Sequence, residues 1–76
     1  MKVPDKFPPG CEFFASFSGD DFVRFPDGKV FVLEDSGETM RSRDGLPMSG
    51  AAPMSEANFL NSAKSNVAFI EWKAAL

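Results

Sequence analysis

Two apolar runs joined by one short turn place the firmest limit on how this chain can fold. The first run is residues 22–25 (Phe-Val-Arg-Phe), the second is residues 30–34 (Val-Phe-Val-Leu-Glu), and Pro26-Asp27-Gly28-Lys29 lies between them. Proline suits the second position of a tight turn, and glycine adopts the positive φ that such turns need. The pattern predicts a β-hairpin. Because apolar residues fall on both sides of the second run, we expect it to be a central strand.

Further strands are expected on either side of this hairpin. Residues 11–18 are rich in Phe, and alternation predicts that Phe13, Ala15 and Phe17 face the core while Phe14 points to the other face. Residues 38–43 read as a polar strand at the sheet edge, where charges discourage further pairing. The sequence therefore predicts an antiparallel meander of three to four strands over residues 11–43.

A helix is predicted after the meander. Ser55 is a good N-cap, Glu56 supplies an acid in the first turn, and the apolar residues Phe59, Leu60 and Ala63 share one face. The fold class is therefore α+β, with one C-terminal helix packed on a small antiparallel sheet. Its parts are an extended Pro-rich arm (1–10), the meander (11–43), a loop (44–54) and the helix (55–76), in a single domain.

The end of the chain allows two readings. If the helix continues, Val67 and Ile70 extend its apolar stripe, whereas Phe69, Trp72 and Leu76 lie on the opposite side. If the helix instead ends near residue 66, residues 67–72 form a last strand. We favour the continued helix, which is then either buried on both faces at its end or presents a contact patch.

Composition limits the chemistry that the chain can perform. The chain has 76 residues, no His and one Cys, so the usual acid–base residue is missing and no internal disulfide can form. Cys11 has no histidine to make it a thiolate and is read as a small hydrophobic residue. Asp20 and Asp21 are adjacent and would diverge in a strand, so they are read as a solvated turn. We expect no enzyme activity, no metal site and no cofactor.

The charge distribution argues against a general nucleic-acid binder. The net charge is -3, with eight acids against four bases in residues 1–38 and three acids against four bases in residues 39–76. Such a binder needs a basic stripe to replace the counterions of phosphate. The first residues contain no apolar signal segment and no apolar run is long enough to span a membrane. We expect a cytoplasmic monomer.

Contact with another protein is the function that remains. The candidate contact residues, chosen because aromatic and basic side chains anchor interfaces, are Lys2, Phe7, Arg24, Lys29, Arg41, Arg43, Phe69 and Trp72. Two alternatives stay open: Phe7 pins the arm to the body instead of meeting a partner, and Trp72 belongs to the core.

A second class of function is single-stranded nucleic-acid binding. Arg24, Arg41 and Arg43 could form a basic patch beside Phe22, Phe25 and Phe31, whose rings would then stack on bases. The competing reading is that these rings form the core.

Two segments of the chain bear on its relation to known proteins. They are Phe7-Pro8-Pro9-Gly10-Cys11 and, further along, residues 22–28 (Phe-Val-Arg-Phe-Pro-Asp-Gly). In its small size, its acidity, its single Cys and its lack of catalytic residues, the chain resembles phage-encoded host-takeover proteins. Within that class, the arrangement of residues 7–11 and 22–28 is similar to that of the RNA-polymerase-binding antitermination proteins of Xanthomonas-type phages. The resemblance implies binding to host RNA polymerase, with altered initiation or termination of transcription. Inhibition of another host machine, such as a CRISPR complex, is the alternative.

Overall fold

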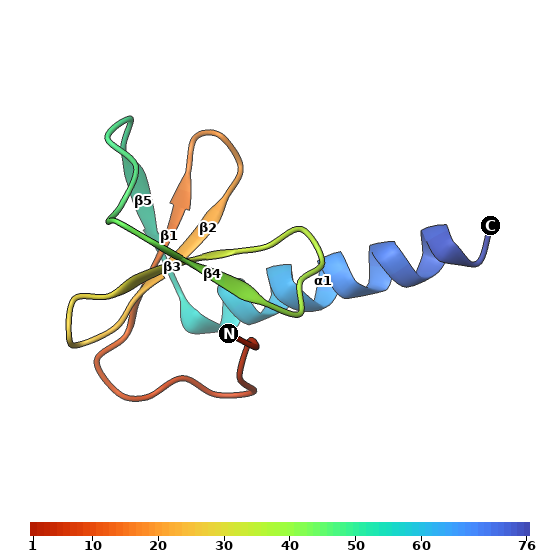
Figure 1. The fold of residues 1–76 in the computed structure, drawn as a ribbon, viewed down its shortest axis with the longest axis horizontal. Helices are drawn as coiled ribbons and strands as arrows, with labels where there is room; N and C mark the ends of the chain where they lie inside the picture. Colours follow the sequence, from red (N-terminus) through yellow and green to blue (C-terminus); the bar gives the residue numbers. More distant parts are fainter.

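The predicted hairpin forms the middle of a five-stranded antiparallel sheet. In a computed structural model, which describes residues 1–76, the strands are β1 (Glu12–Ser16), β2 (Asp21–Arg24), β3 (Val30–Leu33), β4 (Met40–Arg43) and β5 (Ala51–Met54), and one helix follows, α1 (Glu56–Ala74). The strand order is β4-β3-β2-β1-β5, so the first four strands form a meander and β5 returns to pair with β1 (Figure 1). The predicted α+β class, an antiparallel sheet with a C-terminal helix, is confirmed.

The prediction of three to four strands was one strand short. Residues 51–54 were expected to lie in a loop, but they pair with β1 in the register Phe14 with Pro53 and Ser16 with Ala51. Proline donates no hydrogen bond, and it is tolerated here because β5 is the last strand of the sheet. The loop between β4 and β5 is therefore residues 44–50.

The first face of the sheet holds the main core. Phe13, Val23, Leu33 and Met40 point to this face and are buried together with Phe59 of α1. The rings of Phe13 and Phe59 lie 5.2 Å apart between centroids. At the helix start, the Ser55 hydroxyl accepts a hydrogen bond of 3.1 Å from the Asn58 amide, which confirms the predicted N-cap.

The N-terminal arm is ordered and belongs to this core. Phe7 is buried, and its ring packs edge-to-face against Phe13 and Phe59 at centroid distances of 5.0 and 5.5 Å. The beginning of the arm runs beside the start of β4, where the Val3 amide donates to the Glu38 carbonyl oxygen at 2.9 Å. The reading in which Phe7 pins the arm is confirmed.

The second face of the sheet has a smaller core without a helix over it. Phe22, Val30 and Val32 are buried there, with Phe14 and Leu46 packed around them. Phe14 therefore points away from the helix, as predicted.

Phe17 was expected to face the core and instead is exposed. The strand ends at Ser16, where a turn begins: the Ser16 amide donates to the carbonyl oxygen of Asp20 at 2.8 Å, and the Gly19 amide donates back to the Ser16 carbonyl oxygen at 3.1 Å. The turn removes Phe17 from the alternation on which the prediction depended. No helix of the structure is both long and apolar enough to cross a membrane.

Candidate functional site

The helix is longer than the sheet that it covers. Phe59 and Ala63 are its buried residues, and Val67 is the last residue that is even partly buried. Every residue from Ala68 to Leu76 is exposed, so about two turns of helix project from the body, at 1.5 Å per residue (Figure 1). The helix runs unbroken to Ala74, and the alternative of a last strand does not form.

These projecting turns carry the largest exposed apolar side chains of the helix. Phe69 is 56% exposed, Ile70 46% and Trp72 59%, and Leu76, two residues beyond the end of the helix, is 85% exposed. The rings of Phe69 and Trp72 lie 5.9 Å apart between centroids, at an angle of 37°. We call Phe69, Ile70, Trp72 and Leu76 the helix-end patch. Exposed side chains of this kind carry a free-energy penalty in water that contact with a partner relieves.

The helix-end patch answers one open question and reveals one missed residue. Trp72 was equally compatible with the core, and the structure places it outside. Ile70 was assigned to the core stripe because its helical position continues that of Ala63, but the sheet does not extend far enough to cover it. The sequence does not indicate how far along the helix the sheet extends, so it could not predict that Ile70 lies beyond the covered part.

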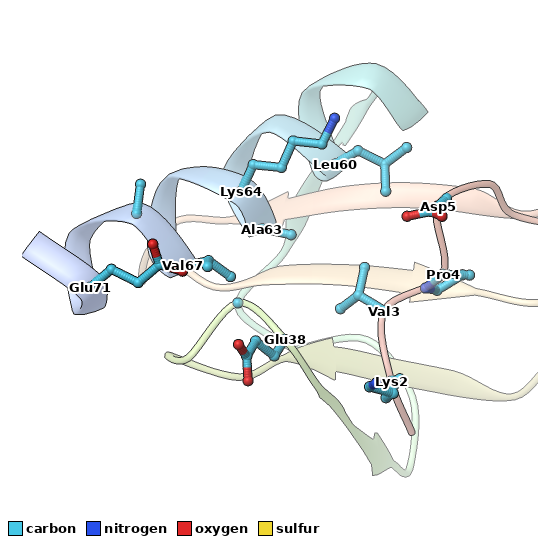
Figure 2. Close-up of a pocket in the computed structure, with 12 residues that line it drawn as sticks. Lys2, Val3, Pro4, Asp5, Glu38, Leu60, Ala63, Lys64, Val67 and Glu71 are labelled. Carbon is cyan, nitrogen blue, oxygen red and sulfur yellow. The ribbon is translucent and has the colours of Figure 1, made fainter.

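A groove lies between the N-terminal arm and α1. Its volume is about 600 Å³. Figure 2 shows Val3 and Pro4 of the arm on one side and Leu60, Ala63 and Val67 of the helix on the other. The charged residues that line it are of both signs, namely Lys2, Asp5, Glu38, Lys64 and Glu71. The lining reaches Glu71 on the projecting turns but includes none of the four helix-end patch residues, so the groove and the patch are distinct surfaces.

The predicted basic residues lie on the second face of the sheet. Strand register places Arg43, Val30, Arg24 and Glu12 in one row across β4, β3, β2 and β1, and Arg41 belongs to the next row. Arg24 donates to the Glu12 carboxylate at 2.9 Å, which neutralises part of the patch. Arg43 and Arg41 are exposed.

The aromatic rings expected beside these arginines are not free to stack on bases. Phe22 is 1% exposed, and the Arg43 guanidinium lies 5.1 Å from its ring centroid. Phe25 and Phe31 pack on each other at 5.4 Å and contact the main core on the opposite face. Phe14, which is half-buried, lies under Arg24 at 5.1 Å. Phe22, Phe25 and Phe31 therefore do not form an exposed stacking surface beside the arginines, as the hypothesis of single-stranded nucleic-acid binding required. The arginines themselves do share one face of the sheet.

The remaining candidates are scattered. Phe7 is in the core and is withdrawn as a contact residue. Lys2 is exposed on the arm and lines the groove, whereas Lys29 is exposed at the hairpin turn beside Asp27, at 3.9 Å. The structure brings neither lysine together with Phe69 and Trp72.

The surroundings of Cys11 favour the protonated thiol over the thiolate. Burial raises the pKa of the Cys11 thiol, and the carboxylates of Glu56 and Asp27 raise it further. A nucleophilic thiol needs the opposite environment, with a base or a cation beside it. No group of three or more Cys, Asp or Glu side chains lies close enough to hold a metal ion.

The helix-end patch is therefore the site that the geometry favours. It gathers four large apolar side chains on a projecting element, whereas the arginines are partly neutralised and the groove carries charges of both signs. Comparison of the chain with models of protein families, with curated proteins and with solved structures finds no match.

Proposed function

We propose that this chain is a non-catalytic protein-binding module that acts sterically on a larger assembly through the end of its helix. The observation that carries the proposal is the exposure of Phe69 and Trp72 on turns that project beyond the body. Aromatic side chains are enriched among the residues that dominate binding energies. An exposed aromatic pair serves no packing purpose within this fold.

The partner that we propose is bacterial RNA polymerase, bound by a phage-encoded regulator that alters initiation or termination. What supports this choice is the resemblance in residues 7–11 and 22–28, together with the small acidic character of the chain. What supports a non-catalytic role is the lack of histidine and the raised pKa of Cys11. The module acts as a cytoplasmic monomer and carries no cofactor.

The experiment is a titration of the untagged chain into fluorescently labelled bacterial RNA polymerase holoenzyme, followed by transcription from a promoter with a downstream terminator. The label belongs on the polymerase because the N-terminal amine of Met1 donates to the Met40 carbonyl oxygen at 3.1 Å and the other end carries the patch. Saturable binding with a changed yield of initiated or terminated transcripts is expected. An unchanged signal at concentrations up to about 100 μM would refute polymerase as the partner.

The second candidate, single-stranded nucleic-acid binding, is favoured only by the shared face of Arg24, Arg41 and Arg43. A gel-shift titration separates it from the first. Binding through phosphates weakens steeply with salt, whereas contact through the helix-end patch changes little.

A further inference from the structure

We propose that the projecting turns of α1 insert into an apolar groove of the partner protein, which places an acidic side chain opposite Lys73. The inference rests on the proposed function and specifies the shape and chemistry of the partner surface. It follows from the arc that the exposed apolar residues cover, from their spacing, and from the one cation among them.

The arc is too wide for a flat partner. At about 100° per residue, Trp72, Phe69 and Ile70 span about 160° of the helix circumference. A helix that packs on one surface buries a stripe of roughly 100°. Only a partner that surrounds the helix on several sides can cover Trp72 and Ile70 together.

The spacing of the anchors fits this form of recognition. Phe69 and Trp72 occupy positions i and i+3, so both lie along one side of the helix, and Leu76 follows two residues after its end. Helices that bind in hydrophobic grooves use anchors with this spacing. Because α1 is already helical in the free chain, binding avoids the loss of conformational entropy that folding a disordered segment would cost.

A second copy of the chain is a poorer occupant. The four side chains of the helix-end patch expose roughly 370–620 Å² in all, if a large side chain offers about 150–250 Å². Two copies that met through this patch alone would bury about 740–1,240 Å², which reaches only the lower limit of the roughly 1,200–2,000 Å² of stable interfaces. A partner that encloses the patch in a groove also buries the surface of the groove walls, so the total buried area can reach this range.

Lys73 specifies the charge of the groove. By helical position it lies between Phe69 and Ile70, inside the apolar arc, and it forms no ion pair within the chain. A groove that encloses the patch therefore takes up this ammonium group, and burial without a carboxylate would be unfavourable. Lys64 is exposed on the same helix but lies outside the arc, so it supplies a matched control.

The test uses the full chain and bacterial RNA polymerase holoenzyme as the probe, with the polymerase labelled. Phe69→Ala and Trp72→Ala are expected to weaken binding by about 30-fold or more each, since anchor residues contribute at least about 2 kcal/mol. Ile70→Ala is expected to weaken it by about fivefold, and Lys73→Glu by about tenfold, whereas Lys64→Glu stays within about twofold. Far-UV circular dichroism verifies that each variant is folded.

The outcomes separate this inference from the proposed function. Wild-type binding that survives Phe69→Ala and Trp72→Ala overturns the inference and leaves a polymerase-binding module. Loss with those two variants but not with Ile70→Ala overturns the enclosing groove in favour of a flat contact. Equal loss with Lys73→Glu and Lys64→Glu overturns the acidic partner residue, because the effect is then general electrostatics. Failure of the wild-type chain itself refutes the proposed partner and the inference with it.

Two further readouts use Trp72, the only Trp of the chain, as a reporter. In the free protein its emission is expected to remain that of a solvated indole at all concentrations and in the presence of vesicles with one-third anionic lipid. A blue shift that grows with protein concentration overturns the groove in favour of a second copy. A blue shift on the vesicles, without binding to polymerase, overturns it in favour of a lipid surface.

Discussion

The contact between α1 and the turn that joins β3 to β4 makes Gly37 the most sensitive position for testing the fold. Gly37 has a φ of 75°. A Cβ atom placed there would collide with the Ala63 carbonyl oxygen of the helix and would lie 2.8 Å from the Asn66 side chain and 3.0 Å from the Val67 amide nitrogen. Backbone atoms cannot rotate away as a side chain can, so the helix would have to move.

The size of the effect follows from two contributions. A residue with a Cβ in the left-handed region costs about 1–2 kcal/mol, and forcing atoms into a packed contact adds about 1–3 kcal/mol. Gly37→Ala is therefore expected to lower the free energy of unfolding by about 2–5 kcal/mol. A chain of this length has about 4–11 kcal/mol in total.

Gly28→Ala is the matched control. Gly28 has a φ of 89°, but no atom lies within 4 Å of the position of its Cβ. Gly28→Ala therefore incurs the backbone contribution alone, and the difference between the two variants isolates the collision with the helix, about 1–3 kcal/mol. Gly19, with a φ of 93° and equally open space, provides a second control.

The assay is urea unfolding followed by far-UV circular dichroism, because Trp72 is exposed and its fluorescence would report weakly on the core. With a denaturant slope of about 1 kcal/mol/M, the midpoint of Gly37→Ala should lie about 1–3 M below that of Gly28→Ala. Equal midpoints would refute the packing of the helix on the β3–β4 turn.

Three substitutions and one chemical reaction test other parts of the account. Phe59→Ala should lower the free energy of unfolding by about 3–5 kcal/mol, because it removes a large side chain from the centre of the main core. Trp72→Ala should change the free energy of unfolding by less than about 0.5 kcal/mol, because this side chain is exposed. Comparable losses for the two variants in urea unfolding would contradict the assignment of Phe59 to the core and Trp72 to the surface. Ser55→Ala should cost about 1 kcal/mol in the same assay, since it leaves the Asn58 amide without its acceptor, and an unchanged midpoint would show that the cap contributes nothing. Cys11 should react with a thiol reagent more slowly at pH 8 than a small-molecule thiol does, because its raised pKa keeps it protonated; a faster rate would contradict the environment described for it.

Local signals in the sequence account for the parts of the fold that were predicted. The turn at residues 26–29 and the cap at Ser55 involve neighbours in the chain, and both form as expected. β5 was missed because Ala51, Ala52 and Pro53 have low strand propensity, and the segment becomes a strand only through pairing with β1, about forty residues away. The structure of residues 51–54 depends on this tertiary pairing, which no local sequence pattern indicates.

The candidate site was predictable in part for a similar reason. Helical periodicity placed Phe69, Trp72 and Leu76 on the face opposite the core, and the structure leaves all three exposed, although the helix ends before Leu76. Periodicity gives the direction of a side chain but not the extent of the surface that covers it, which is why Ile70 was assigned to the core. The arginines were grouped correctly by their position in the hairpin and the edge strand, but the burial of Phe22 depended on the second core of the sheet.

Hydrogen–deuterium exchange of the chain with and without bacterial RNA polymerase tests the central claim most directly. In the free chain, amides of residues 68–74 should exchange faster than those of β2 and β3, because the projecting turns are exposed whereas these strands lie inside the sheet. With polymerase bound, the account predicts strong protection of residues 68–74 and little change in the sheet. Protection confined to the strands that carry Arg24 and Arg43, with the helix end still exchanging freely, would contradict it.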